Sequence, residues 1–135
     1  MMQTTIQTKQ RTVLCVDDDD DDREMINDVI KEVDESCLVM NAASGEEALR
    51  MLHKNERLPN LILLDINMPG MGGKETLKKI KESETLSTIP VIVFTTSTNP
   101  ADAAFFSNYG VSVRTKPDRF QTMVRTVEQF LSEFS

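Results

Sequence analysis

The stretch that decides the fold is Leu61-Ile62-Leu63-Leu64-Asp65, in which four aliphatic residues are followed at once by a carboxylate. An unbroken apolar run of this length is typical of a strand that is covered on both faces in a parallel sheet. Ligands of such sheets bind beyond the carboxyl ends of the strands. Asp65 therefore stands where a functional acid would lie.

Comparable apolar runs lie on both sides of this one and alternate with stretches of helical periodicity. The runs are residues 12–16, 37–42, 91–94 and, more weakly, 111–115. Apolar residues recur at the spacing of one helix face within residues 25–33, 48–52, 76–80 and 120–134. Ser44 and Glu47 are placed as a capping box before the second of these helices. Strand and helix alternating five times predict an α/β fold, a doubly wound five-stranded parallel sheet with helices on both faces.

Composition limits the classes of function. The 135 residues are 39% hydrophobic, so residues 11–135 are expected to form one domain after a flexible start at residues 1–10. The net charge of −7 opposes nucleic-acid binding through a basic face. No apolar run approaches the roughly 20 residues that span a bilayer, and no secretory signal opens the chain, so a cytoplasmic protein without a membrane anchor is expected. Cys15 and Cys37 lie in apolar runs and are expected to be buried thiols.

The residues that end the predicted strands carry the chemistry. The first run ends in Asp17 and Asp18, the third in Asp65, the fourth in Thr95 and the fifth in Lys116. Because the carboxyl ends of parallel strands meet at one edge of the sheet, these side chains are expected to converge. Crowded carboxylates repel one another, and Mg2+, which takes oxygen ligands, would relieve that repulsion. Asp65 would then act as a nucleophile toward phosphorus, with Mg2+ and Lys116 neutralising charge on the transferred oxygens.

Several polar residues have simpler explanations. Asp19, Asp20 and Asp21 suit the start of a helix, where negative charge complements the helix dipole. Asp22 either reaches back toward the metal or caps that helix, and the sequence leaves both open. The acidic run is not a calcium-binding EF-hand loop, because Asp22 occupies the glycine position of such a loop. His53, the only histidine, is expected at the surface.

The whole pattern resembles the receiver domains of two-component response regulators. Residues 63–73, Leu-Leu-Asp-Ile-Asn-Met-Pro-Gly-Met-Gly-Gly, are similar to the phosphoacceptor loop of that family, and the spacing to Asp17, Thr95 and Lys116-Pro117 matches. The resemblance implies a flavodoxin-like (βα)5 fold with strand order 2-1-3-4-5. It also implies roles for individual residues: phosphorylation of Asp65, a direct metal ligand at Asp18, a water-mediated one at Asp17, a backbone carbonyl ligand at Asn67, a switch hydroxyl at Thr95, a phosphate partner at Lys116 and a cis bond before Pro117.

The same resemblance implies the biology. It indicates a single-domain regulator that receives its phosphoryl group from a sensor histidine kinase, of the phytochrome or hybrid type, or from a histidine phosphotransfer protein. Such a protein signals to a downstream protein that the sequence does not name, as a monomer or weak dimer. It phosphorylates and dephosphorylates itself and turns over no separate substrate.

Two positions depart from the family pattern. Val113 stands where an aromatic residue usually partners the switch threonine, so Tyr109 or Phe106 is a candidate substitute on the switch and partner surface. Thr96 stands where a small residue is usual, and it is expected to narrow access to Asp65.

Two other functions are compatible with parts of the pattern. A Mg2+-dependent phosphatase would use Asp65 as its nucleophile, but such phosphatases carry an acid two residues later, where this chain has Asn67. A degenerate receiver would serve only as a scaffold, yet all of its acidic, hydroxyl and lysine positions are intact.

Overall fold

The computed structural model describes residues 10–54, 57–96 and 99–134. Within these residues, five strands and five helices alternate, and the strands form one parallel sheet in the order β2-β1-β3-β4-β5. The predicted doubly wound α/β fold and its strand order are therefore confirmed. The elements are β1 (Thr12–Val16), α1 (Asp20–Val33), β2 (Leu38–Ala42), α2 (Gly45–Lys54), β3 (Leu61–Leu64), α3 (Gly73–Glu82), β4 (Val91–Thr95), α4 (Pro100–Asn108), β5 (Ser112–Thr115) and α5 (Phe120–Glu133).

The predicted flexible start at residues 1–10 lies outside the described residues, except for Gln10. The side-chain amide of Gln10 donates a hydrogen bond to the carbonyl of Ser36. The boundaries of the predicted domain, residues 11–135, stay a prediction.

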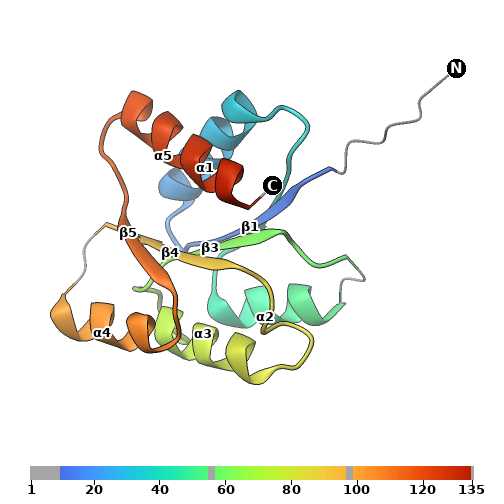
Figure 1. Ribbon diagram of the computed structural model, residues 1–135, viewed down its shortest axis with the longest axis vertical. Coiled ribbons are helices and arrows are strands. Elements are labelled where there is room, and N and C mark those ends of the chain that lie inside the picture. The colour runs from blue at the N-terminus through green and yellow to red at the C-terminus, as the bar shows by residue number, and fades with distance from the viewer. Residues whose placement is uncertain (1–9, 55–56, 97–98, 135) are drawn as a thin grey trace, which may run out of the picture.

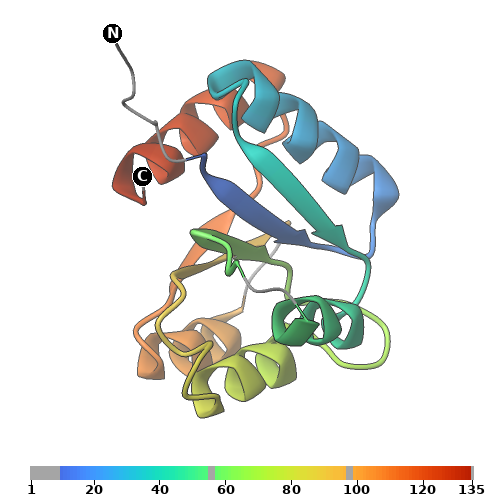
Figure 2. The same cartoon turned by 90° about the vertical axis from the view of Figure 1, so that its right-hand side faces the viewer.

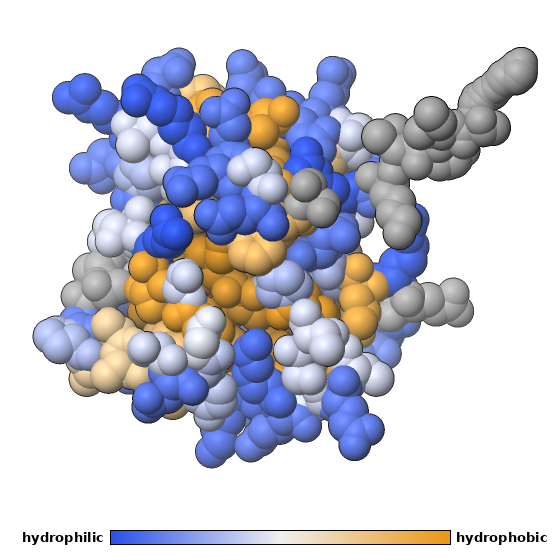
Figure 3. All heavy atoms as spheres, in the orientation of Figure 1, coloured by the Kyte–Doolittle hydropathy of each residue, from blue (hydrophilic) through white to orange (hydrophobic). Residues whose placement is uncertain are grey.

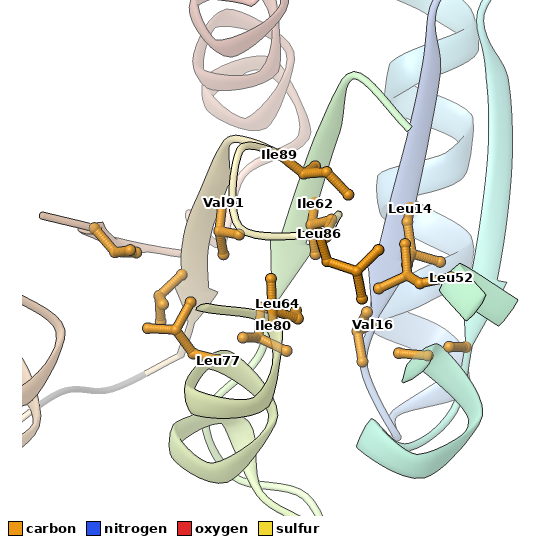
Figure 4. Close-up of a cluster of buried hydrophobic side chains, with 14 of the residues drawn as sticks. Leu14, Val16, Leu52, Ile62, Leu64, Leu77, Ile80, Leu86, Ile89 and Val91 are labelled. Atoms are coloured by element: carbon orange, nitrogen blue, oxygen red, sulfur yellow. The ribbon is translucent and has the colours of Figure 1, made fainter. Parts of the chain in front are cut away.

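Helices cover both faces of the sheet, as Figures 1 and 2 show: α1 and α5 lie on one face, and α2, α3 and α4 lie on the other. Each face has its own apolar core because alternate residues of a strand point to opposite sides. On β1, Leu14 and Val16 join the core under α2, α3 and α4, whereas Val13 and Cys15 join the core under α1 and α5. Figure 4 shows part of the first core, where Ile62 and Leu64 of β3 lie among side chains from the neighbouring strands and helices.

Burial separates the central strands from the edge strands. Every residue of β3 and β4 is buried, whereas β2 and β5 each have exposed positions. This difference explains why the run of residues 111–115, which forms the edge strand β5, was the weaker signal, whereas the run of residues 61–64 was unbroken. On the face drawn in Figure 3, hydrophobic residues are visible between the two helical layers, and mostly hydrophilic residues lie over the helices.

Caps fix where the helices begin. The Asp19 side chain accepts hydrogen bonds from the backbone N–H groups of Asp21 and Asp22, so Asp19 is the N-cap of α1. The predicted role of the acidic run at a helix start is thus borne out. Ser44 accepts from the N–H of Glu47 as predicted, but the Glu47 carboxylate accepts from the N–H of Ala43, one residue before the usual partner in a capping box.

The helix α4 was expected only from the alternation of elements, not from an apolar stripe. Its one buried residue is Phe106, so a stripe hardly exists. A better signal was the pair Asn99-Pro100: the Asn99 side chain accepts from the N–H of Asp102, and Pro100 occupies the first turn.

A glycine allows α3 to begin against the backbone of Asp65. A Cβ added at Gly73 would lie 2.4 Å from the carbonyl oxygen of Asp65 and 2.8 Å from the Cα of Ile66. The N–H of Gly73 also donates to the carbonyl of Ile66. The residues after β3 are therefore held by α3 at a contact that no larger residue permits without a backbone shift.

We expect Gly73→Ala to lower the free energy of unfolding by about 1–3 kcal/mol, the range for overpacking a close contact. Urea denaturation followed by circular dichroism measures it. Gly72→Ala is the matched control, because its Cβ would approach only the carbonyl oxygen of Ile66, at 3.3 Å. Equal losses in the two variants would contradict the proposed steric cause.

Candidate functional site

Three carboxylates meet at the carboxyl ends of β1 and β3. Backbone hydrogen bonds hold two of them: the N–H of Asp17 donates to Ala42 on β2, and the N–H of Asp65 donates to Val16 on β1. One oxygen from each of Asp17, Asp18 and Asp65 lies within 4.8 Å of the others. Asp17 and Asp65 are buried, whereas Asp18 is exposed. The predicted convergence of the acids is therefore found.

Lys116 brings a positive charge to this cluster from the end of β5. Its N–H donates to the carbonyl of Thr95, which ties the residue to the end of β4. Its ammonium forms an ion pair with the carboxylate of Asp17 and lies 3.9 Å from Oδ1 of Asp65. It also donates to Oδ2 of Asp22 at 3.0 Å. Carboxylates from the ends of β1 and β3 and from α1 thus lie around one ammonium.

The Asp22 contact is the functional feature that sequence reasoning did not find. The two alternatives considered for Asp22 were a metal ligand and a helix cap. The cap of α1 is Asp19, whose side chain accepts from the N–H of Asp22, so the cap alternative is wrong. The Asp22 carboxylate instead accepts a hydrogen bond from Lys116, and its role as a metal ligand stays a prediction. The signal available in the sequence was spacing alone, since the third residue of a helix that follows a strand can face back over the end of that strand.

Asp65 resists ionisation. Burial raises the pKa of its carboxyl group from 3.8 to about 6, and the negative charge of Asp17 acts in the same direction. Lys116 and hydrogen bonds from the Thr95 hydroxyl and the Ile66 N–H lower the pKa but only partly offset burial. Thr95 is fully buried against this carboxylate, so the predicted hydroxyl does lie in the site.

Lys116 is held in its charged form. Burial alone would lower the pKa of this ammonium, but hydrogen bonds to Asp17 and Asp22 and the charges of Asp17 and Asp65 together raise it. The cluster therefore combines a charged ammonium with several carboxylates.

The donor set fits a divalent cation. The three clustered carboxylates offer only oxygen ligands, which Mg2+ and Mn2+ accept, and one exposed member leaves the cluster open to water. A single ammonium leaves them incompletely neutralised. Asn67, the predicted backbone ligand, lies two residues beyond Asp65 with an exposed side chain, and its metal contact stays a prediction.

One expectation about the backbone was wrong. The bond between Lys116 and Pro117 is trans, since the described residues include no cis peptide. An X–Pro bond prefers the trans form by about 0.5–1 kcal/mol, and here Lys116 reaches Asp17 and Asp22 without leaving that form.

The residues predicted for the switch surface lie in different environments. Thr96 is exposed and lines a pocket of about 230 Å³ together with Asp22 and Lys116. Val113 is half-buried against the core of α2, α3 and α4, and Phe106 is fully buried in that core. Tyr109 ends α4 and packs on Phe105 with 5.3 Å between ring centroids. His53 is exposed in the last turn of α2, as expected.

The sequence matches the family model of the response regulator receiver domain over residues 13–128. This chain is a response regulator receiver domain. Response regulators of this family act in two-component signalling, where receiver domains accept phosphoryl groups from histidine kinases or phosphotransfer proteins and bind a divalent metal at an acidic pocket.

Several relatives of this receiver domain are known. It is 33% identical to the response regulator Rcp1 of Synechocystis over 91% of this chain and 90% of Rcp1. It is 42% identical over 90 residues to FilR2, a probable methanogenesis regulatory protein of Methanothrix harundinacea, and that match covers 63% of this chain and 58% of FilR2.

Solved structures agree with this assignment. The phosphorylated cyanobacterial phytochrome response regulator RcpA superimposes with a TM-score of 0.85 at 28% identity, over 93% of this chain and 94% of RcpA. The Mn2+-bound form of Rcp1 superimposes with a TM-score of 0.80 at 30% identity, over 90% and 92% of the two chains. Within the described part of this receiver domain, no helix is long and apolar enough to cross a membrane.

The raised pKa of Asp65 predicts that its negative charge lowers the free energy of unfolding by an amount that depends on pH. A pKa of about 6 in the folded chain, against 3.8 as the ordinary value, means that folding favours the protonated form. In metal-free buffer, we expect Asp65→Asn to be more stable than the wild type by about 1–3 kcal/mol above pH 7. The difference should shrink as the pH falls from about 6 toward 3.8.

Urea unfolding at pH 8 and pH 4.5 measures this difference. Asp28→Asn removes the same charge from an exposed position on α1 and is the control. A gain in stability that is the same at both pH values would contradict burial of Asp65 as the cause.

Proposed function

We propose that this receiver domain accepts a phosphoryl group on Asp65 from a sensor histidine kinase or a histidine phosphotransfer protein, in a Mg2+-dependent reaction, and signals by a change in its surface. The observation that carries the proposal is the convergence of Asp17, Asp18 and Asp65 with the Lys116 ammonium at one edge of the sheet. We also propose that it is a cytoplasmic single-domain regulator, a monomer or weak dimer that binds neither nucleic acid nor membrane. Its downstream protein partner is not identified.

The proposed reaction uses Asp65 as the nucleophile. A carboxylate oxygen forms a bond to phosphorus while the bond from phosphorus to the donor's histidine nitrogen breaks, and the electron pair stays on that nitrogen. With a pKa of about 6, Asp65 is mainly ionised at neutral pH and can attack. The product is an acyl phosphate on this chain, and its hydrolysis resets the domain without turnover of a separate substrate.

A bound metal would be held by Asp17, Asp18, Asp65 and the backbone carbonyl of Asn67. Mg2+ at that site supplies positive charge that offsets the carboxylates and the phosphoryl oxygens. The Mn2+-bound form of Rcp1 supports a divalent ion in a relative of this kind. Mg2+ is the ion proposed here, because it takes few carboxylates and keeps several waters, as a partly exposed cluster allows.

The signal would arise from contacts that exist only after phosphorylation. Thr95 and Lys116, which both contact or approach the Asp65 carboxylate, are proposed to bind phosphoryl oxygens, and their movement would change the ends of β4 and β5. A change of state requires such differential contacts. Val113 has no hydrogen-bonding group, so Tyr109 or Phe106 is proposed to take part in the readout around α4 and β5. Tyr109 is the more accessible of the two, since Phe106 is fully buried.

The direct test is phosphorylation by acetyl phosphate in Mg2+, read as a mobility shift on a Phos-tag gel. We expect the wild type to shift, and Asp65→Asn and EDTA-treated wild type to remain unshifted. Asp28→Asn, which removes an exposed carboxylate on α1, should shift like the wild type. A wild type that migrates with Asp65→Asn would refute the proposed phosphoacceptor.

Thr96 is expected to slow small phosphodonors, because it lines the open pocket beside Lys116. We expect Thr96→Ala to accelerate both labelling by acetyl phosphate and loss of the label, on the order of a few-fold, because such donors must approach an in-line position at Asp65. Time courses on Phos-tag gels measure both rates. Thr88→Ala, at an exposed position before β4, is the control, and unchanged rates in Thr96→Ala would show that Thr96 does not restrict access.

A further inference from the structure

The Lys116 ammonium lies closer to α1 than to the proposed phosphoacceptor. Its distance to Oδ2 of Asp22 is 3.0 Å, whereas its distance to Oδ1 of Asp65 is 3.9 Å. The first distance is a charge-assisted hydrogen bond, and the second is beyond hydrogen-bond range. Lys116 therefore gives its hydrogen bonds to Asp17 and Asp22, while Asp65 receives only its longer-range charge.

The helix α1 fixes the position of Asp22. Asp19 caps the helix, and the first turn then presents the Asp22 carboxylate to the site. Arg23 ties this turn to the end of β1 by donating to the carbonyl of Asp17 and pairing with Asp20. Asp22 thus extends from a helix turn that hydrogen bonds anchor to the end of β1.

The pair is open to the solvent on the Asp22 side only. The Asp22 side chain is 35% exposed and that of Lys116 is 6% exposed. Both line the pocket of about 230 Å³ that Thr96 also borders. Lys116 thus borders this pocket and also lies 3.9 Å from Oδ1 of Asp65.

From this geometry we infer that Asp22 is a positioning residue: it holds the Lys116 ammonium on the α1 side of the site and weakens its hold on a phosphoryl group at Asp65. The inference rests on the proposed phosphorylation of Asp65. It assigns to the last member of the acidic run a function separate from capping and from metal binding. It also links the phosphorylation site to the first turn of α1, a route that does not involve Val113.

The matched pair Asp22→Asn and Asp21→Asn tests it. Both variants remove one negative charge from the first turn of α1, but the structure places only Asp22 on Lys116. The probe is beryllofluoride with Mg2+, a phosphoryl analogue that would bind at Asp65, titrated and followed by fluorine NMR. Asp22→Asn should bind the probe about two- to fivefold more tightly than Asp21→Asn, the change expected from loss of an ion pair with one partly exposed member. Asp22→Glu restores the charge and should bind like the wild type.

A second readout reports on the contact without a phosphoryl analogue or metal. The Lys116 Nζ resonance, assigned by its loss in Lys116→Arg, should shift in Asp22→Asn and stay in place in Asp21→Asn. Equal probe affinities in the two variants, weaker binding by Asp22→Asn, or an unmoved Nζ resonance would each overturn the inference. If the wild type neither binds the probe nor is labelled by acetyl phosphate, the proposed function itself fails, and the inference fails with it.

Discussion

The site depends on the attraction between one ammonium and the carboxylates that the fold forces together. Parallel strands bring Asp17 and Asp65 to the same edge because the backbone N–H of each is hydrogen-bonded to a neighbouring strand. Mutual repulsion is therefore built into the native state, and burial intensifies it. Burial is the largest cause of the raised pKa of Asp65, the charge of Asp17 adds to it, and Lys116 offsets part of the cost. A chain in this condition is poised to accept further positive charge.

The packing of the fold keeps these charged residues close together. The charged residues follow central strands that are packed on both faces, since every residue of β3 and β4 is buried. This packing keeps the ends of the two strands in place. Gly73 also contributes, because its lack of a side chain lets α3 begin against the carbonyl of Asp65. The loop after β3 is therefore in contact with α3 as well as with the sheet. The aromatic pair Phe94 and Phe130, with ring centroids 5.4 Å apart, joins β4 to α5 behind the site. Stability and function thus share the same strands.

The parts of this arrangement that sequence could predict are those that follow from periodicity and strand ends. Asp17, Asp65, Thr95 and Lys116 each terminate an apolar run, and the rule that parallel strands end at a common edge is enough to gather them. Asp22 obeys no such rule, because its contact with Lys116 depends on the residue at which α1 begins and on the path of a long side chain. The helix α4 was obscure for a different reason: a short helix with one buried residue has almost no periodicity to detect. The trans bond before Pro117 depends on tertiary geometry that no local pattern encodes.

The six consecutive aspartates have two different roles, at the start of α1 and in the acidic site. Of the six consecutive aspartates, Asp19 serves the helix by capping it, and Asp20 pairs with Arg23 at the surface. Asp17 and Asp18 join Asp65 in the cluster, and Asp22 faces them from the next turn across Lys116. The helix start is what separates these roles, since the cap at Asp19 determines which carboxylates point to the site and which to water. Moving that cap by one residue would rotate the first turn of α1 by about 100° and would carry Asp22 away from Lys116. The electrostatics of the site are therefore set by a helix cap that carries no part of the chemistry.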